Sequence, residues 1–411
     1  MRSRKFAVLS IAAITTVFFL LLSGVGASFF SAYTHSAVHV TEVQVFASYQ
    51  FNTLKNPTSL LWLEVQQHNA PSKYVLYIAD SRNHVIRSFK PDLGQLSVVA
   101  GTLDTSGYVN GSATSAKFNY PVGLSGERRV WGGQTGCNQW WNATCISPQI
   151  SVYTTHVLHI NDSQNYVVRK LCTGTQHQNS GDCTGQMGMV STIGGSHTKG
   201  YTNGTASSAS FSALAGHSDI GGACYINDAE NHCIRAEDSS GNVTTYAGTA
   251  YAGYVNGYRT AARFNVPTKV ISDSSGNMIV ADVGNNAIRK IDTSGYVTTV
   301  GGQGPTAPGY VNGPGYAAKF FRPTSIVQSG SDTYVADSFN NCIRKIDSSG
   351  NVSTYAGSTE AGLVNGSLSQ ARFNMPTDLV ILNGFMYIAD SANNAIRVIN
   401  MSTGTVSNYI T

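Results

Sequence analysis

The stretch Val280-Ala281-Asp282-Val283-Gly284-Asn285-Asn286-Ala287-Ile288-Arg289 decides the fold, because its frame returns six times along the chain. The frame is Asp, two variable residues, Asn, two more, then Ile or Val, then Arg. Its copies are Asp80-Asn83-Ile86-Arg87, Asp162-Asn165-Val168-Arg169, Asp228-Asn231-Ile234-Arg235, Asp282-Asn285-Ile288-Arg289, Asp337-Asn340-Ile343-Arg344 and Asp390-Asn393-Ile396-Arg397. A pattern that returns at a long period indicates one supersecondary unit that is copied and stacked.

Short β-branched segments surround the fourth copy and alternate with Gly, Asn, Asp and Ser. They predict four strands, over residues 267–271, 278–282, 287–291 and 296–300. No sustained helical periodicity interrupts the repeats. A tail follows the fourth strand, reads Gly-Tyr-Val-Asn-Gly or a close variant, and runs on to a phenylalanine in each of five units: Phe118, Phe211, Phe264, Phe320 and Phe373.

Successive units open on proline, which measures their length. Two units span 56 and 53 residues (323 − 267 and 376 − 323), and three others open at Pro57, Pro121 and Pro376. Four antiparallel strands in a unit of this length are typical of a propeller blade, whose two faces are covered only when blades stack radially. We therefore predict an all-β, six-bladed β-propeller of four-stranded antiparallel blades over residues 57–411, preceded by an N-terminal hydrophobic helix.

The repeat resembles the NHL repeat family of β-propellers. The resemblance is carried by YIADSRNHVIR (77–87), VADVGNNAIRKID (280–292) and YAGYVNGYRTAARFNVPT (251–268), and it covers about residues 50–411. We interpret the frame as structural, with Asn in the left-handed turn position and Arg bonded to Asp or to turn carbonyls. Sixfold repetition favours a scaffold role, because a catalytic group is normally needed once.

Composition excludes some partners and indicates a compartment. Charged residues are 12% of the chain, about half the usual share. The formal charge of +4 includes Arg2, Arg4 and Lys5, so it falls to +1 without them (4 − 3). No basic patch or RNA-binding motif appears, which argues against nucleic acid.

The N-terminal residues 1–32 have the features of a secretory signal. A basic lead precedes an apolar run over residues 6–24, and Val25-Gly26-Ala27 suits cleavage. The run is nearly long enough to span a bilayer, so a retained signal-anchor of a single-pass type II membrane protein is the alternative. Either way we expect the propeller outside the cytosol, secreted or on the extracellular surface. Residues 33–56 are a lead-in, and either 43–48 or 405–409 could supply the strand that closes the ring.

Glycosylation acceptors agree with that compartment. We expect N-linked glycans at the Asn-x-Ser/Thr sites Asn110, Asn142, Asn203, Asn242, Asn351, Asn365 and Asn400. Asn161 has the same pattern but sits at a strand end, where we expect it to be inaccessible.

The second unit is longer than the others and carries four of the seven cysteines. Two insertions, at about residues 128–152 and 172–186, account for the extra length and should emerge on one face. In an oxidising compartment we predict the disulfides Cys137–Cys145 and Cys172–Cys183, and Cys224 could pair with Cys233 on the adjacent strand. Cys342 is predicted to be a free core thiol.

Three tryptophans and a tyrosine mark the first insertion: Trp131, Trp140, Trp141 and Tyr153. They form either a surface for a partner or the insertion's own small core. The sequence leaves both open.

Some relatives implied by the resemblance are enzymes. They are the zinc lyase that completes peptide amidation and strictosidine-synthase-like propellers with a central acidic residue, and their sites lie in the axial channel. Here the first strands that should line that channel offer His217, Asp219, Lys269 and Asp378. Because His84 and His232 lie in hairpin turns, and His159 aligns with Tyr77 inside a strand, the lyase's ligand set is not visible.

His217 with Asp219 is the candidate catalytic pair, and the alternative is a satisfied polar pair at the channel mouth. We predict no resident cofactor or metal, although the axial carboxylates would suit a calcium ion or a water equally. We expect an extracellular binding or scaffolding module, with a protein or glycan partner and with self-association as a further option. The alternative is an enzyme with an axial site near His217 and Asp219.

Overall fold

The computed structural model describes residues 16–19, 30–33, 53–65, 73–132, 152–174, 187–220 and 223–411. The chain divides into two compact units, Met1–Thr53 and Leu54–Thr411. In the first unit, β1 (Thr16–Phe19) and β2 (Phe30–Tyr33) pair antiparallel. The predicted N-terminal helix is therefore not confirmed; the rest of that segment lies outside the described residues. Within the described ranges, no helix has the length and apolarity needed to cross a membrane.

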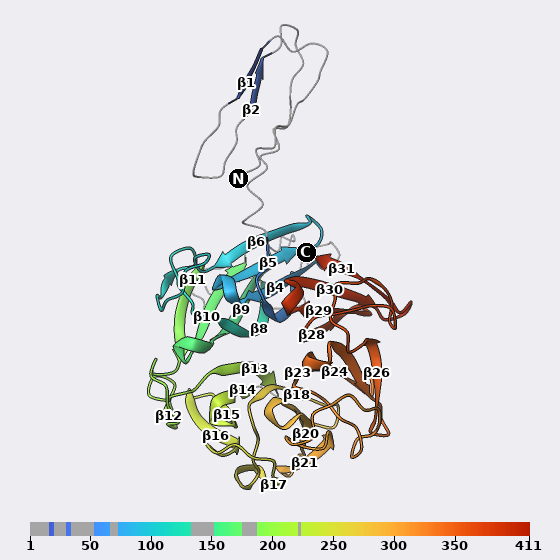
Figure 1. Ribbon diagram of the computed structural model, residues 1–411. Helices are drawn as coiled ribbons and strands as arrows, with labels where there is room; N and C mark the ends of the chain where they lie inside the picture. Colours follow the sequence, from blue (N-terminus) through green and yellow to red (C-terminus); the bar gives the residue numbers. More distant parts are fainter. Residues whose placement is uncertain are drawn as a thin grey trace, which may run out of the picture. The chain divides into compact units, whose positions relative to one another are not determined.

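The second unit is a closed ring of six antiparallel sheets, which confirms the predicted propeller. In Figure 1 the sheets follow one another from blue through green and yellow to red, and the sixth returns beside the first. The first three blades are built from β3 (Pro57–Val65), β4 (Lys73–Asp80), β5 (Val85–Lys90), β6 (Gln95–Ala100); β8 (Pro121–Gly132), β9 (Val152–Asp162), β10 (Val167–Gly174), β11 (Met189–Gly194); β13 (Leu214–Ile220), β14 (Ala223–Asp228), β15 (Cys233–Glu237) and β16 (Asn242–Gly248).

The last three blades repeat the same order. They consist of β18 (Pro267–Ser272), β19 (Met278–Asp282), β20 (Ala287–Ile291), β21 (Tyr296–Gly301); β23 (Pro323–Ser329), β24 (Asp332–Asp337), β25 (Cys342–Ile346), β26 (Asn351–Gly357); β28 (Pro376–Leu382), β29 (Phe385–Asp390), β30 (Ala395–Asn400) and β31 (Thr405–Ile410). Of the two segments that could close the ring, residues 405–409 lie in β31, the fourth strand of the sixth blade. Residues 43–48 lie outside the described residues.

Five blades have a short fifth strand that the sequence did not predict. It comes from the tail of the preceding unit and pairs with the outer strand of the next blade. These strands are β7 (Gly111–Ser112), β12 (Gly204–Thr205), β17 (Gly257–Tyr258), β22 (Gly313–Pro314) and β27 (Gly366–Ser367). Each opens on a glycine with φ between +132° and +151°, which a side chain would disfavour. The tails therefore latch each blade onto its neighbour.

The repeated frame fastens that latch, as blade four shows. Asp282 ends β19; its Oδ1 accepts from Asn265 N (2.7 Å), and its Oδ2 accepts from Asn285 Nδ2 (2.7 Å). Arg289 donates to the same Oδ2 (2.8 Å) and to the Val255 carbonyl in the preceding tail (2.9 Å). The structural interpretation of the frame is confirmed.

One detail of that interpretation is wrong. The frame Asn ends a 3₁₀ turn, and the residue after it takes the left-handed conformation, because its N–H must turn back to the start of the 3₁₀ turn. The turns are η2 (Ser81–Asn83), η3 (Ser163–Asn165), η5 (Ala229–Asn231), η7 (Val283–Asn285), η8 (Ser338–Asn340) and η9 (Ser391–Asn393). The left-handed residues are His84, Tyr166, His232, Asn286, Asn341 and Asn394.

The core lies between blades. The tail phenylalanines are fully buried; Phe264, for example, packs with Ile234 of blade three and Val280 of blade four. Burying one such side chain contributes about 1.5–3 kcal/mol. The junction of blades six and one is closed in the same way, by Leu60 and Ile78 against Ile396.

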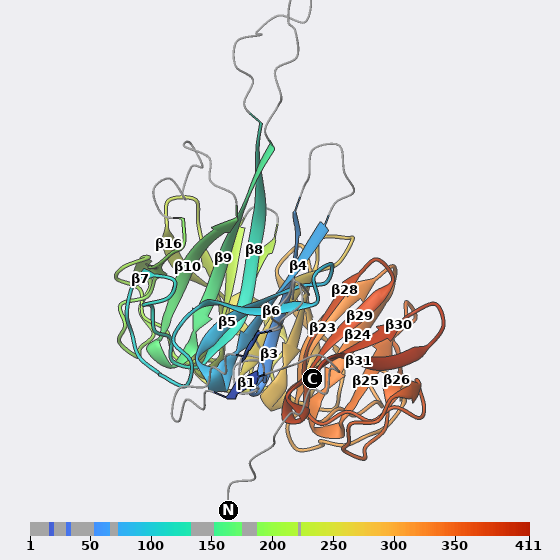
Figure 2. The same cartoon turned by 90° about the horizontal axis from the view of Figure 1, so that it is seen from above.

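The second blade is extended where its insertions begin. β8 and β9 run on to Gly132 and Val152, which are register partners, and Gly174 at the end of β10 lies opposite Thr155. Both insertions therefore leave the same end of the blade, as predicted; Figure 2 shows β8 and β9 extended there. Residues 133–151 and 175–186 lie outside the described ranges.

The predicted aromatic surface is only partly described. Trp131 on β8 lies opposite Tyr153 on β9 in the register. Trp140 and Trp141 lie outside the described residues, so the choice between a partner surface and a small core stays open.

The cysteine predictions have different outcomes. Cys137, Cys145 and Cys183 lie outside the described residues, so the two loop disulfides stay predictions. The pairing of Cys224 with Cys233 is wrong: both are free, because Cys224 lies opposite Glu237 and Cys233 opposite Asp228, at the two ends of one hairpin. Cys342 is a free, buried thiol, as predicted.

Candidate functional site

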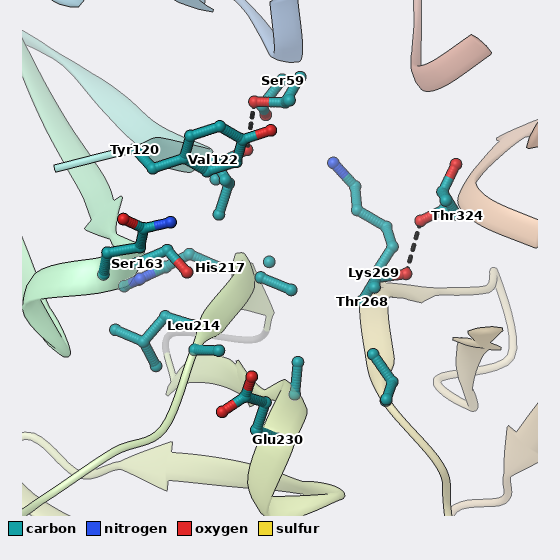
Figure 3. A pocket seen from close by; sticks show the side chains of 18 of the residues that line it. Ser59, Tyr120, Val122, Ser163, Leu214, His217, Glu230, Thr268, Lys269 and Thr324 are labelled. Atoms are coloured by element: carbon teal, nitrogen blue, oxygen red, sulfur yellow. Dashed lines mark hydrogen bonds between the residues drawn. The ribbon is translucent and has the colours of Figure 1, made fainter. Parts of the chain in front are cut away.

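An axial cavity of about 690 Å³ opens among the first strands of all six blades, where the channel was predicted. Its wall includes Thr58, Ser59, Val122, Gly123, Ala215, Gly216, His217, Thr268, Lys269, Thr324, Thr377 and Asp378. Tyr120 and Glu230 lie farther out, from the segments that enter and flank the first strands. In Figure 3 Lys269 points from blade four into this space, with His217 and Glu230 on the side of blade three.

Threonine hydroxyls of four blades each donate a hydrogen bond to the next blade around the axis, and blades two and three donate none of this kind. Thr268 Oγ1 donates to the Thr324 carbonyl (2.7 Å), and Thr324 Oγ1 donates to the Thr377 carbonyl (3.0 Å). Thr377 and Thr58 continue the pattern toward blades one and two. Blades two and three hold Val122 and Ala215 at the corresponding position, so they cannot contribute a hydroxyl.

The same two blades carry glycine at the next position, Gly123 and Gly216. A Cβ at Gly123 would lie 2.3 Å from the Ala215 carbonyl oxygen, and one at Gly216 would lie 2.2 Å from that of Thr268. Glycine is therefore required here by the close approach of neighbouring backbones. Blades two and three therefore have no side chain at the position where the other blades have Ser59, Lys269, Ser325 and Asp378.

Two buried amides stand behind these glycines. Asn161 and Asn227 are fully buried, and neither side chain has a hydrogen-bond partner among the residues that the structure describes. The other blades have alanine at this position: Ala79, Ala281, Ala336 and Ala389. A buried polar group without a hydrogen-bond partner lowers the stability of the folded state. These two amides, which the other blades lack, therefore call for a ligand or an ordered water as their partner. The burial of Asn161 also confirms that this acceptor site is inaccessible.

The charged groups of the cavity are paired. Lys269 Nζ lies 3.4 Å from Asp378 Oδ1, across the axis. Asp378 also accepts from Ser325 Oγ (2.6 Å) and from the backbone N–H of Leu60 (2.8 Å). At the mouth, Lys199 and Glu230 form an exposed ion pair of 2.7 Å. The cavity is therefore polar but close to neutral.

A second cluster lies toward the insertion end of blades two and three. His217 Nε2 lies 2.9 Å from Cys224 Sγ and 3.8 Å from Asp219 Oδ1. His159 Nδ1 of blade two lies 3.9 Å from Asp219 Oδ2, which also accepts from Ser125 Oγ (3.1 Å). The predicted pair His217 and Asp219 is thus brought together, and His159 joins it.

Burial and neighbouring charges shift the acid–base behaviour of this cluster. Burial alone would lower the pKa of His217, but Cys224 and Asp219 beside it raise that pKa to about 10. Burial would raise the pKa of Asp219, but His217, His159 and Ser125 stabilise the carboxylate, and the net pKa is below its usual value. His217 and Asp219 are therefore a charged pair at neutral pH when no ion is bound.

The geometry does not fit a nucleophilic triad. In such a triad the nucleophile meets one imidazole nitrogen and the acid orients the other. Here both Cys224 and Asp219 approach Nε2 of His217, while its Nδ1 is buried with no hydrogen-bond partner in the described parts of the chain. Donor atoms of His159, His217 and Asp219, from two strands, instead lie within 4.8 Å of one another.

Sequence reasoning missed His159 and Cys224, although the repeats contained the signal. Four blades have tyrosine where blade two has His159, namely Tyr77, Tyr225, Tyr334 and Tyr387. The position just before it in the strand holds Leu or Met in four blades, Thr333 in blade five and Cys224 in blade three. His159 and Cys224 are side chains that no other blade carries at these positions, so the repeated scaffold does not require them. The strand position of His159 alone does not show that its ring lies 5.0 Å from the ring of His217 in the next blade.

The predicted glycosylation sites stay predictions. Asn110, Asn203 and Asn365 are exposed in the tails, and each Oδ1 accepts from the frame arginine of the next blade at 2.6–2.8 Å. These contacts involve only the amide oxygen and not the amide nitrogen, to which a glycan is attached. Asn142 lies outside the described residues; Asn242 and Asn351 are exposed, and Asn400 is half-buried.

Comparison with known proteins agrees with this architecture. No protein-family model matches the chain. NHL repeat-containing protein 2 from Bos taurus is 32% identical over 167 residues, which are 37% of this chain and 23% of that protein. Together with the six-bladed ring, this decides the repeat type. The chain is an NHL-repeat β-propeller.

Other similar proteins match more of this chain. Protein SUPPRESSOR OF QUENCHING 1, chloroplastic, from Arabidopsis thaliana is 25% identical over 354 residues, 82% of this chain and 30% of that protein. This NHL-repeat propeller thus spans less than a third of either relative. An auxiliary nutrient binding protein from Bacteroides thetaiotaomicron has a TM-score of 0.55 at 18% identity, covering 87% of this chain and 70% of its own. A second, from Bacteroides ovatus, has a TM-score of 0.50 at 16% identity, with 89% and 79% covered. At these identities the solved structures show the fold alone.

Proposed function

We propose that this NHL-repeat propeller is an extracellular or surface-displayed binding module that takes a neutral, hydroxyl-rich ligand in its axial cavity. The observation that carries the proposal is the break in the axial pattern at Gly123 and Gly216. A scaffold with six equivalent blades has no need of it, and it removes two side chains from the wall of a cavity of about 690 Å³. Ligand sites commonly measure about 300–1,000 Å³.

The chemistry of the wall favours a neutral ligand with many hydroxyl groups. The two ion pairs of the cavity leave no charge to attract an ion of either sign. Serine and threonine hydroxyls and the Lys269 ammonium supply both donors and acceptors. A mono- or disaccharide matches this set and this volume. The two solved propellers of the same fold are named nutrient binding proteins, which supports a binding role.

The proposed location rests on the sequence. The basic lead, the apolar run over residues 6–24, the acceptor triplets and the low share of charged residues all agree with passage through the secretory pathway. Expression in a eukaryotic secretory host should give protein with N-linked glycans, seen as a mass decrease on enzymatic deglycosylation. Unglycosylated protein retained in the cytosol would refute this part of the proposal.

The ligand can be tested by thermal unfolding with a panel of neutral mono- and disaccharides. A ligand at 100 times its Kd stabilises the folded state by about 2.7 kcal/mol. Lys269→Ser introduces the residue that blades one and five carry at this position, and we expect it to weaken binding by about 10–100-fold, since it removes a charged donor. Lys290→Ser, on β20 and outside the cavity wall, is the matched control. The proposal fails if no sugar stabilises the protein or if Lys269→Ser binds as well as the control.

Self-association through the insertion of blade two is a further part of the proposal. The register partners Gly132 and Val152 can be joined by Asn-Gly in place of residues 133–151, because two-residue turns of this type close antiparallel hairpins. If the insertion mediates assembly, the shortened protein should keep its thermal stability and become monomeric in sedimentation. An unchanged oligomeric state would exclude this surface.

A further inference from the structure

Three potential metal ligands converge where blades two and three meet, on the side of the insertions, and a cysteine lies beside one of them. One donor atom from each of His159, His217 and Asp219 lies within 4.8 Å of the others. Cys224 Sγ lies 2.9 Å from the Nε2 of His217 that faces this group. The donors come from three strands of two blades, β9, β13 and β14, so the fold, not a local loop, brings them together.

From this geometry we infer that His159, His217 and Asp219 bind one transition-metal ion with the preferences of Zn²⁺, and that Cys224, beside His217, moves in as the fourth ligand. The site shares His217 with the wall of the axial cavity, but ion binding there does not depend on a ligand in that cavity. Imidazole, thiolate and carboxylate are the ligands that zinc uses in proteins. Hard ions such as Ca²⁺ prefer an all-oxygen set, which this cluster does not offer.

The distances suit an ion after a small adjustment. Ligand atoms about 2.0–2.3 Å from a tetrahedral ion lie roughly 3.4 Å from each other. The observed separations of 2.9, 3.8 and 3.9 Å lie on either side of that value. His217 is held rigidly, with 1% of its side chain exposed, whereas Asp219 is 41% exposed and can move toward an ion. Ser125 Oγ already holds one oxygen of Asp219, as outer partners of metal ligands do.

The alternative, a purely structural polar cluster, does not explain why the residues occur once. Where blade three has His217, the other blades have Leu60, Leu124, Val270, Ile326 and Leu379, all buried and apolar. Those blades fold around the same inter-blade core without a histidine. Burying His217 therefore costs stability that no repeat of the scaffold requires, which is the pattern expected of a functional site.

The repeats also provide substitutions that the scaffold already tolerates. His217→Leu, His159→Tyr and Asp219→Ser each introduce the residue found at the same position in another blade. Cys224→Met does the same, after Met278 and Met386. His232→Asn is the matched control, because blades four to six carry Asn at this turn position and His232 lies away from the cluster.

The test uses the full chain without a histidine tag, prepared reduced and stripped with a chelator. Zn²⁺ is titrated calorimetrically and Co²⁺ is followed by absorption. We expect one ion per chain, and a loss of affinity of at least about 100-fold in His217→Leu, His159→Tyr and Asp219→Ser, since even outer-partner changes cost 10–100-fold. His232→Asn should bind as the unaltered protein does. Cys224→Met should abolish the thiolate-to-cobalt charge-transfer absorption.

Several results would overturn the inference. They are no binding by the unaltered protein, unchanged affinity in His217→Leu, or an equal loss in His232→Asn. Thermal unfolding of each metal-free variant is measured in parallel. A variant that melts with the unaltered protein but binds no ion supports the site, and one that binds normally contradicts it. Sugar binding is scored separately, so failure of one proposal leaves the other standing.

Discussion

Replacing the frame arginine of blade four, Arg289→Met, should destabilise the propeller by about 3–5 kcal/mol, because it leaves the Asp282 carboxylate buried without its counter-charge. Arg289 is fully buried and donates to Asp282, to two tail carbonyls and to Asn256 at 2.7–3.1 Å. Its guanidinium also lies 5.0 Å from the Tyr254 ring and 5.3 Å from the Phe264 ring. Methionine fills part of the space but satisfies none of these groups.

The expected loss is large compared with the total. Proteins are stable by about 5–15 kcal/mol, so 3–5 kcal/mol is a substantial fraction. The assay is urea unfolding followed by intrinsic fluorescence, with the shift of the midpoint as the readout. The double variant Arg289→Met with Asp282→Leu should recover part of the loss, since the unpaired carboxylate is then absent.

The control for this prediction is an exposed ion pair of similar length. Lys199 and Glu230 are 2.7 Å apart, but their side chains are 58% and 51% exposed. Lys199→Met should therefore shift the urea midpoint far less than Arg289→Met does. If Arg289→Met cost no more than Lys199→Met, burial would not be what makes the frame important, and the account of the latch would be refuted.

Three further predictions test the axis and the turns. Gly216→Ala should cost about 1–3 kcal/mol or more in urea unfolding, because its Cβ would meet the Thr268 carbonyl at 2.2 Å; Gly194→Ala, whose Cβ would have only ordinary contacts, should be near neutral. Hydrogen bonds from the Ser294 side chain and the turn backbone lower the pKa of Asp292 below its ordinary 3.8, so its stabilising effect is present above that pH and lost below it. The difference in melting temperature between the unaltered protein and Asp292→Asn should accordingly be constant from about pH 7 to 5 and shrink toward pH 3; a constant difference at pH 3 would contradict it. Asp378→Asn should cost about 1–3 kcal/mol, measured by thermal unfolding, because the amide NH₂ would face donors; an unchanged melting temperature would show that water replaces them.

The frame arginine, the tail glycine and the tail phenylalanine act together. The glycine turns the tail back, and the short strand of the tail pairs with the next blade. The frame arginine of that blade donates hydrogen bonds to carbonyl groups of the tail. The phenylalanine then fills the space between the blades. A single sequence unit thus encodes both a blade and its attachment to the following one. The result is a ring whose axis is free to vary.

Variation at the axis is concentrated in blades two and three. Gly123, Gly216, His159 and His217 all lie at their junction, and both insertions leave blade two. The frame at these blades is unchanged, with Arg169 and Arg235 fully buried. The scaffold therefore holds constant what joins the blades and varies what faces the channel.

The sequence by itself determined the number of blades, their four main strands and the first-strand lining of the axis. Periodicity carries this information locally, since each strand and turn is written in its own few residues. It placed Asp282 and Arg289 correctly as a pair, because both lie in one hairpin. It also singled out His217 and Asp219, which are two residues apart on one strand.

Only the tertiary structure decided which blades exchange contacts and which side chains meet across a junction. The latch of a tail onto the following blade, the approach of His159 to His217 and the separation of Cys224 from Cys233 all depend on register and on the packing of sheets against each other. Neither is written in a single segment. The distances between side chains of neighbouring blades depend on how the six sheets pack around the axis, which is a property of the closed ring.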